Sequence, residues 1–222
     1  MNKILEINNV SLGYKNNFIL KNIDITLTKG DFLVIHGKNG SGKSSFLKFL
    51  YMKIFPFSGK YKIFGEKVFF SNKNFINRSR KRMGIILQKN FLIPYLSVVE
   101  NVQLSFEIQS KDSASKDNRV FEILKWVGLE KKAEFKVVNL SDGEKQKVVI
   151  ARALVSNPPI LIADEPMLYL DFISRKKLFF LLNAINKLGT TIIIADNQNK
   201  DEYLNSKKIN IEQFVVTKWV IS

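Results

Sequence analysis

The stretch "HGKNGSGKSS" (36–45) contains the spacing G-x-x-x-x-G-K-[ST] from Gly37 to Ser44. Glycines at this spacing let successive backbone amides point toward phosphate oxygens, and the lysine and hydroxyl that follow can reach the phosphates and Mg²⁺. The motif follows an apolar run and opens a helical pattern, as a phosphate-binding loop must. We therefore predict a nucleotide site formed by Gly37, Lys38, Asn39, Gly40, Ser41, Gly42, Lys43, Ser44 and Ser45.

A second group that could do chemistry is the acidic pair Asp164 and Glu165, at the end of the apolar run in "PILIADEP". Parallel sheets place their ligands at the carboxyl ends of strands, so Asp164 is expected to hold Mg²⁺ together with Ser44. Glu165 has no neighbouring cation in the sequence and is expected to orient or deprotonate an attacking water. The alternative, a helix cap, is disfavoured by the proline that follows.

The elements that would position these residues alternate along the chain. Short apolar runs bounded by turn residues predict buried strands, and the longer stretches between them predict helices. This alternation indicates an α/β domain with a mainly parallel sheet. The expected strands are 31–37, 83–88, 159–165 and 190–196, and the expected helices are 42–55, 117–129, 141–156 and 174–189.

Other parts of the chain follow different patterns. The first thirty residues alternate polar and apolar side chains around the turn-like "KNN", which predicts an antiparallel β-layer, and 56–68 adds a further strand to it. A mostly helical insertion with a polar loop at 109–118 follows the strand that ends at Gln88. We expect a single domain over 1–222, with a nucleotide-binding core (1–88 and 141–222) and a helical subdomain (89–140).

Composition narrows the functional classes. The 222 residues are 45% hydrophobic and 25% charged, which is ordinary for a soluble globular protein. No apolar run reaches the roughly 18 residues of a membrane helix, the start lacks a signal-peptide pattern, and no cysteine is present for a disulfide or thiolate metal site. The net charge of +15 comes from scattered lysines without a nucleic-acid motif, so we expect no nucleic-acid partner, whereas attraction to an anionic membrane surface fits the same charge.

The segment "LSDGEKQ" (140–146) resembles the signature of ABC ATPases. The phosphate loop, Gln88, this signature, "ILIADEP" and Asp171 occur in the order of that family, and the resemblance covers 4–198. A GTPase is disfavoured because "NKD" (199–201) is only a near miss of the guanine-binding motif N-K-x-D. The resemblance implies a RecA-like P-loop core with a mainly parallel sheet, an N-terminal antiparallel β-layer and an inserted α-helical subdomain.

The resemblance also implies roles for individual residues. ABC ATPases bind ATP and Mg²⁺ as head-to-tail homodimers, in which each ATP lies between the phosphate loop of one subunit and the signature of the other. Gln88 would contact Mg²⁺ and relay the nucleotide state to the helical insertion, and Asp171 would link the two sites. Ser141 and Gly143 would contact the γ-phosphate across the dimer. Tyr14 would stack on adenine, with packing inside the β-layer as its alternative role.

Three departures from the family pattern bear on turnover. Asn197 stands where the family carries a switch histidine, and an amide can neither carry the imidazole's charge nor shuttle its proton. Asp142 replaces the first signature glycine, and its carboxylate either repels the γ-phosphate or turns away and pairs with Lys145. The segment "MLYLD" replaces the usual small, polar "TGNLD". We therefore expect a weak but real ATPase, with Glu165, Gln88 and Asn197 as its catalytic residues.

Segments such as "MGIILQKNFLIPYLSVVENV" resemble the FtsE-like group of bacterial cell-division ATPases. That resemblance implies an integral membrane partner of the FtsX type, a place on the cytoplasmic face of the cell membrane through that partner, and a role in cell division. One alternative is the ATPase subunit of a lipoprotein-release or macrolide-efflux transporter, and another is a nucleotide-gated binding module with little hydrolysis. A nucleic-acid-associated ABC protein is supported only by the charge of +15.

Overall fold

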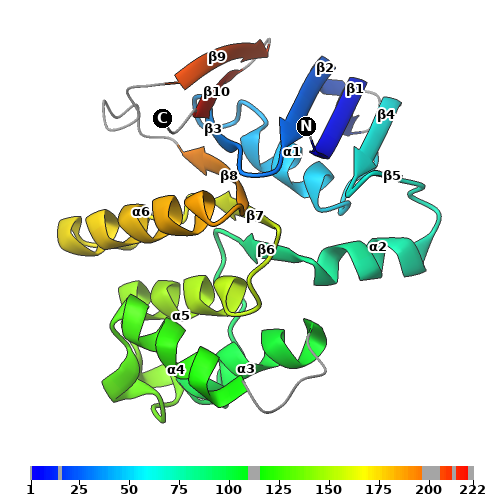
Figure 1. Ribbon diagram of the computed structural model, residues 1–222. Helices are drawn as coiled ribbons and strands as arrows, with labels where there is room; N and C mark the ends of the chain where they lie inside the picture. The colour runs from blue at the N-terminus through cyan, green and yellow to red at the C-terminus, as the bar shows by residue number, and fades with distance from the viewer. Residues whose placement is uncertain (1, 15–16, 110–115, 197–205, 212–213, 220–222) are drawn as a thin grey trace.

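The structure, a computed structural model, describes residues 2–14, 17–109, 116–196, 206–211 and 214–219 (Figure 1). Its central sheet has six strands in the order β6-β7-β8-β3-β10-β9. Four of them are parallel and lie within the apolar runs predicted as strands, because a strand covered on both faces needs apolar side chains throughout. They are β3 (Phe32–His36), β6 (Met83–Ile86), β7 (Ile160–Asp164) and β8 (Thr191–Asp196).

The other two strands were not predicted from the sequence. β9 (Ser206–Ile211) and β10 (Phe214–Trp219) pair antiparallel with each other, and β10 also pairs antiparallel with β3. This part of the chain follows the segment covered by the family resemblance, which gave no assignment for it. The sheet is therefore mixed, with its antiparallel strands at one edge.

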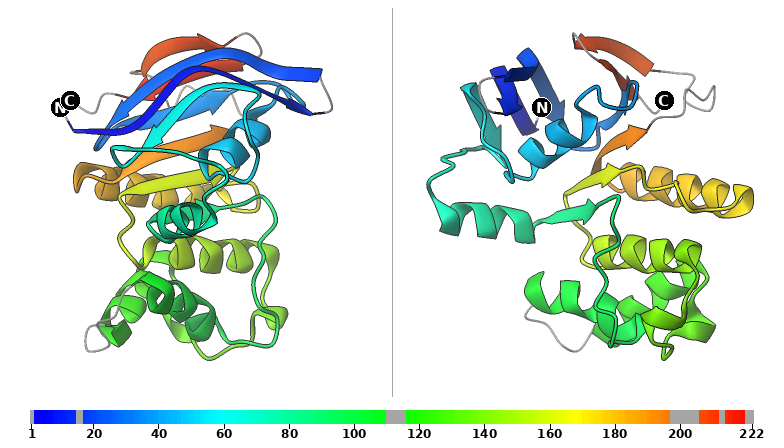
Figure 2. Two further views of the ribbon diagram at one scale, coloured as in Figure 1. Left: turned by 90° about the vertical axis from the view of Figure 1, so that its right-hand side faces the viewer. Right: turned by 180° about the vertical axis from the view of Figure 1, so that it is seen from behind.

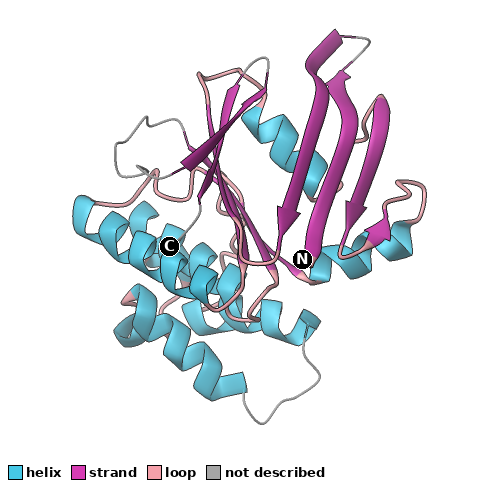
Figure 3. Cartoon of the chain, turned by 45° about the horizontal axis from the view of Figure 1, so that its top comes forward, coloured by secondary structure: helices cyan, strands magenta, loops and turns pink. Residues whose placement is uncertain are grey.

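A second, antiparallel sheet has the order β2-β1-β4-β5. Its strands are β1 (Lys3–Tyr14), β2 (Asn17–Thr28), β4 (Ser58–Ile63) and β5 (Glu66–Lys67). It confirms the predicted N-terminal β-layer. Figure 3 shows the two sheets as separate layers, with α1 (Lys43–Leu50) between them, where it contacts β1, β7 and β8.

Helices α5 and α6 cover the opposite face of the central sheet, and α3 and α4 lie beneath α5 (Figure 1 and Figure 2). Three form close to their predicted positions: α4 (Lys116–Val127), α5 (Asp142–Leu154) and α6 (Phe172–Lys187). With α3 (Val98–Gln109), they confirm the α/β fold class. The boundaries of a helical subdomain at 89–140 stay a prediction. No helix in the described ranges is both long and apolar enough to span a bilayer.

Two helices differ from expectation. α1 ends at Leu50 rather than near residue 55, because Met52 takes a left-handed φ of 61° and Pro56 disfavours helical backbone before it. α2 (Lys73–Lys81) was not predicted, since only Phe75 and Ile76 supply apolar side chains in this basic segment. Its start is fixed by Asn72, whose side chain accepts a hydrogen bond from the Phe75 amide at 2.9 Å.

Alternate residues of the parallel strands enter two separate hydrophobic cores. Leu33 and Ile35 of β3 face α1 and the β-layer, whereas Phe32 and Val34 face the helices on the other side. Because successive side chains of a strand point to opposite faces, the two cores fix the rotation and register of each strand. The four parallel strands consequently end at one edge of the sheet, where the loops with the predicted site residues begin.

Candidate nucleotide-binding site

The carboxyl ends of the parallel strands bring polar residues from distant parts of the sequence together. In the ladder, His36 at the end of β3 lies opposite Asp196 at the end of β8, and Asp164 at the end of β7 lies opposite Ala195. The chain leaves β6 two residues before Gln88. Carboxyl ends of this kind are where α/β sheets hold their ligands.

The loop from β3 to α1 has a backbone conformation that is suited to binding an anion. Gly42, the residue before the helix, has φ 100°, and a Cβ there would lie 2.6 Å from Ile19 Cγ2. Only glycine fits this left-handed, crowded position. α1 has no side-chain cap, so its first amides remain available for a ligand, and the helix dipole adds positive potential there.

Lys43 is the charged centre of this loop. Its side chain is 5% exposed, and its Nζ donates hydrogen bonds to the carbonyl oxygens of Gly37 (2.7 Å) and Lys38 (3.0 Å). Burial lowers the pKa of Lys43, while the charges of Glu165 and Asp164 act in the opposite direction. Two neutral carbonyl oxygens do not compensate the charge of a buried ammonium, so the site suits a polyanionic ligand. The residues present therefore fit a nucleoside triphosphate.

A cavity of about 440 Å³ joins this loop to Gln88 and Glu165. The cavity brings the residues of the phosphate loop together with Gln88 and Glu165, whose predicted roles stay predictions. Its lining also includes two apolar residues that the sequence analysis missed. The cavity is lined by Phe18, Ile19, Asn39, Gly40, Ser41, Gly42, Lys43, Ser44, Ser45, Gln88 and Glu165.

The two acidic residues, Asp164 and Glu165, lie in different environments. Asp164 is 8% exposed, and burial raises its pKa, opposed by a hydrogen bond from Ser44 and by the charges of Lys48 and Lys43. The contact between Asp164 and Ser44 brings together two of the predicted Mg²⁺ ligands. No group of three His, Cys, Asp or Glu suited to a metal occurs among the described residues. One carboxylate and one hydroxyl still fit Mg²⁺, which is commonly held by few protein groups and by substrate phosphates.

Glu165 faces the cavity from a strained turn. Its φ is 47°, and its amide donates to the carbonyl oxygen of Ala195 at 2.9 Å. The Gln88 side-chain amide lies 3.5 Å from its carboxylate, at the long limit of a hydrogen bond. The predicted base and the predicted Mg²⁺ contact thus share one side of the cavity.

Two aromatic residues of the β-layer, Tyr14 and Phe18, differ in their relation to this cavity. The hydroxyl of Tyr14 lies 3.5 Å from Ser45 Oγ, but Tyr14 is not among the residues that line the cavity. Phe18 does line it, half-exposed and edge-on to Phe57 at 5.3 Å between ring centroids. Only the hairpin register, which sets Phe18 opposite Gly13, could have indicated this from sequence. The role of Tyr14 in holding adenine stays a prediction.

The signature residues lie apart from this cavity, and none of them contributes to its lining. Ser141 caps α5, accepting a hydrogen bond from the Glu144 amide in a capping box. Asp142 has a 73% exposed side chain with Lys145 Nζ 3.7 Å away, as in the second of the two alternatives from the sequence. In the first turn of α5, the negative charge of Asp142 also interacts favourably with the positive end of the helix dipole.

Two other predicted residues fall in different places. Asp171 caps α6, accepting hydrogen bonds from the Ser174 amide (2.9 Å) and hydroxyl (2.8 Å). These bonds lower the pKa of Asp171. Asn197 lies outside the described residues, so its predicted role stays a prediction.

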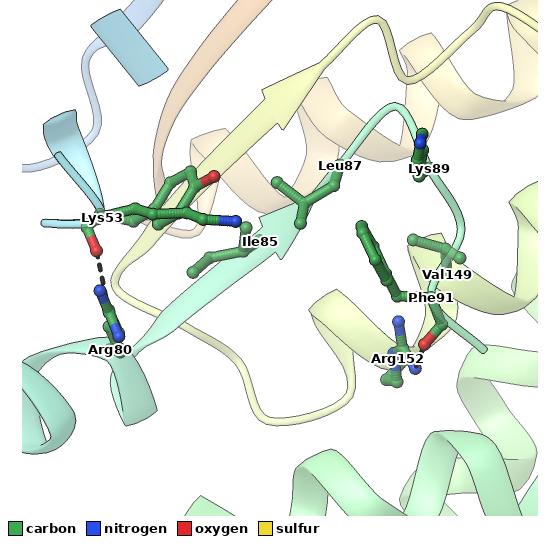
Figure 4. Close-up of a pocket in the computed structure, with 9 residues that line it drawn as sticks. Lys53, Arg80, Ile85, Leu87, Lys89, Phe91, Val149 and Arg152 are labelled. Carbon is green, nitrogen blue, oxygen red and sulfur yellow. Dashed lines mark hydrogen bonds between the residues drawn. The ribbon is translucent and has the colours of Figure 1, made fainter. Parts of the chain in front are cut away.

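A second cavity, of about 410 Å³, opens beside the loop that follows Gln88 (Figure 4). In Figure 4, Lys53 extends toward Ile85 and Leu87, and the ring of Phe91 stands across from it. Four cationic side chains and no carboxylate line this cavity, called the cationic cavity below. Its lining residues are Tyr51, Lys53, Arg80, Ile85, Leu87, Lys89, Phe91, Val149 and Arg152.

Comparisons with known proteins agree with this geometry. The chain matches the family described as ABC transporter over residues 20–168. It is 33% identical over 198 residues to the cell division ATP-binding protein FtsE of Streptococcus pneumoniae, covering 89% of this chain and 86% of that protein. It is 34% identical over 218 residues to FtsE of Bacillus subtilis, covering 97% and 95%.

Two further relatives broaden the comparison. The methionine import ATP-binding protein MetN of Francisella tularensis is 36% identical over 200 residues, covering 88% of this chain but 57% of that protein. A dimeric, post-hydrolysis ATP-binding cassette solved with ADP and Pi has a TM-score of 0.81 and 31% identity, covering 88% of both chains. The identities to FtsE and MetN are too similar to choose between them.

Proposed function

This chain belongs to the ABC transporter family, whose nucleotide-binding domains are P-loop ATP hydrolases, and from this premise we propose that it drives a membrane complex by ATP-dependent dimerisation. The observation that carries the proposal is the position of Lys43. This buried cation lies between a glycine loop and a pair of carboxylates, around one cavity that also contains Gln88.

The polar residues in and beside the cavity have distinct roles in the proposed reaction. Lys43 and the loop amides hold the β- and γ-phosphates and stabilise charge that develops as the γ-phosphoryl group leaves. Glu165 orients the attacking water and accepts its proton. Ser44, Asp164 and Gln88 would hold Mg²⁺, which supplies charge neutralisation on the phosphates.

A second copy of the chain would complete the site. Ser141 and Gly143 do not line the cavity, so in the proposed reaction they serve the nucleotide of the partner subunit. The dimeric state of the solved relative supports this arrangement. ATP itself then forms part of the interface, and the protein alone is expected to be monomeric.

This dimerisation is tested by Glu165→Gln, which keeps size and hydrogen bonding but removes the base. The variant is expected to form a stable dimer with ATP and Mg²⁺, measured by sedimentation velocity, because the interface forms while hydrolysis is blocked. Lys43→Ala in the same background is the control and should stay monomeric, because its phosphate-binding charge is gone. A mass that does not change with ATP in Glu165→Gln contradicts the sandwich dimer.

The proposed rate is low because Asn197 replaces the switch histidine. By analogy with loss of one oxyanion-hole donor, this costs about 2.7–4 kcal/mol of transition-state stabilisation. Asn197→His is therefore expected to raise kcat more than it changes KM, in steady-state assays with the membrane partner present. A fast wild-type enzyme with a neutral Asn197→His substitution would contradict this assignment.

We propose an integral membrane subunit of the FtsX type as the partner, and cell division as the process, at the inner face of the membrane. The FtsE relatives support this choice, while MetN supports the alternative of another ABC transporter, including the lipoprotein-release and macrolide-efflux types. Co-purification from the native membrane in the presence of ATP decides between them. Recovery of an FtsX-type subunit supports the first choice, and recovery of a transporter subunit supports the alternative. We propose no nucleic-acid partner.

A further inference from the structure

A cavity of about 810 Å³ lies between α4 and α6, at the amino ends of β7 and β8. It is bordered by the segment 157–159, which leads into β7, and by Gly189 and Thr190, which precede β8. The nucleotide cavity lies at the opposite ends of the parallel strands, and the two cavities share no lining residue. The volume is within the range of roughly 300–1,000 Å³ that is typical of small-molecule sites. This space is called the α4–α6 cavity below.

The two helices give the α4–α6 cavity an apolar wall. Among the apolar residues, Trp126 is 55% exposed and Leu188 is 85% exposed, although both line a hollow. Exposed apolar surface that is bordered by charged side chains is typical of binding sites. The helical apolar residues of the wall are Ile123 and Trp126 of α4, Leu181 and Ile185 of α6, and Leu188 at the end of α6.

One of the three cations in the lining is neutralised within the protein. The Arg119 guanidinium forms an ion pair with Glu122 at 3.5 Å and donates hydrogen bonds to the side-chain oxygen of Asn157 and to the carbonyl oxygen of Val155 (3.4 Å). Glu122 is also the one carboxylate among the described lining residues. The charge of Arg119 is therefore already balanced.

The other two cations, Lys29 and Lys125, are not balanced in this way. Neither side chain forms an ion pair or a hydrogen bond with the residues that the structure describes. The carboxyl ends of α4 and α6, which lie beside them, each carry the equivalent of about half a negative charge. The two lysines consequently leave about one positive charge in excess.

The position of Lys29 is set by the turn before β8. A Cβ at Gly189 would lie 3.0 Å from Lys29 Cε and 3.6 Å from its Nζ, so the lysine side chain lies directly against this glycine. Gly189 has φ 102°, a conformation that suits glycine, and the missing side chain leaves room for the lysine. The ammonium is thereby held beside the apolar wall.

We propose that the α4–α6 cavity binds an amphipathic carboxylate, a molecule with an apolar chain or ring and one anionic group. The apolar part would lie on Trp126 and Leu188, and the carboxylate would pair with Lys29. A single carboxylate matches the excess of about one positive charge, whereas a phosphate monoester carries about 1.5 to 2 negative charges at neutral pH. This proposal is independent of the proposed function, because it uses no residue of the nucleotide site.

The site is tested by titrating decanoate into the full chain without nucleotide, by isothermal calorimetry, with decanol as an uncharged ligand of the same chain length. Decanoate should bind at one site and at least about tenfold more tightly than decanol, because only the carboxylate pairs with Lys29. Lys29→Gln should remove this difference by weakening decanoate about tenfold while leaving decanol unchanged. Lys60→Gln, which removes the charge of an exposed lysine on β4, is the matched control and should change neither affinity.

The apolar wall is tested with two substitutions of Trp126. Trp126→Ala should weaken decanoate and decanol alike, by about tenfold, because both lose the indole surface. Trp126→Phe keeps an aromatic ring, so binding should persist, but the change in tryptophan fluorescence that decanoate causes in the wild type should disappear. This second variant also covers the case in which Trp126→Ala does not fold.

Three results would overturn the proposal. The first is the absence of saturable decanoate binding at concentrations up to about 1 mM. The second is an equal effect of Lys29→Gln and Lys60→Gln, which would show that the carboxylate is not recognised at Lys29. The third is decanoate binding that neither substitution of Trp126 alters, in calorimetry or in fluorescence, which would place the ligand elsewhere on the protein.

Discussion

The backbone of Glu165 lies in the left-handed region, with φ 47°, where a side chain with a Cβ is disfavoured by roughly 1–2 kcal/mol. The same residue carries the carboxylate that we assign as the base. Strain of this kind is commonly held at functional sites by the surrounding structure. Here the bond from the Glu165 amide to Ala195 and the rigid Pro166 hold the turn in place.

At the scale of this residue, Glu165→Gly is expected to be more stable than Glu165→Ala by about 1 kcal/mol. Both variants lose the carboxylate and its contacts, so they share the loss of hydrolysis, and only the alanine keeps the strained Cβ. Urea unfolding of the two monomers without nucleotide measures the difference. Equal stability of the two variants would show that the turn is not strained.

The site could be predicted from sequence where its residues act through local backbone geometry. Gly42 and Lys43 belong to one loop whose spacing determines its shape, and Asp164 ends an apolar run that can only be a buried strand. Phe18 could not be found in this way. Its place at the cavity arises from hairpin register, which sets it opposite Gly13 and which periodicity does not encode.

The same distinction applies to elements. Strands buried on both faces were found because their apolar runs are continuous, whereas the polar helix α2 was missed because its start depends on one cap, Asn72. β9 and β10 were missed because β10 joins the sheet by pairing with β3, which is distant in sequence, and β9 pairs only with β10. Helix α1 was predicted too long because periodicity does not show where a backbone turns.

At the scale of elements, Arg152 fastens α5 to the loop after Gln88. Its guanidinium donates to the carbonyl oxygens of Phe91 (3.0 Å) and Asn90 (3.2 Å), and burial lowers its pKa. Arg152→Lys keeps a cation but cannot reproduce this fork. It should destabilise the fold by about 1.5–3 kcal/mol in urea unfolding. The control is Arg78→Lys, whose ion pair with Glu66 is exposed, so that this substitution should cost little stability.

At the scale of the whole molecule, part of the net charge of +15 is concentrated around the cationic cavity (Figure 4). Phe91 at its margin is 65% exposed. Exposed apolar surface rimmed by charge is typical of interaction sites. The cavity adjoins the loop after Gln88, so a partner seated there would sense changes at the nucleotide. We propose it as the docking place of the membrane subunit, through a segment that carries carboxylates.

The double variant Lys53→Glu, Lys89→Glu should therefore weaken the complex with the membrane subunit at least tenfold, because it reverses two charges at the contact. ATP binding by the isolated protein should not change. Affinity is measured with detergent-solubilised partner at low and high salt, where the wild-type complex should weaken with salt. Lys125→Glu, an exposed lysine on α4, is the control. Unchanged affinity in the double variant would place the partner elsewhere.

The pairing of β10 with β3 has a consequence for solution behaviour. β3 holds the nucleotide loop at its end and is apolar and buried along its length. Without β10 it would be a bare sheet margin, and unpaired margins of this kind recruit strands from other molecules into aggregates. Because β10 and β9 extend the sheet beyond β3, the edge of the sheet lies at β9. The β9–β10 pair thereby prevents β3, the strand that leads into the phosphate loop, from pairing with strands of other molecules.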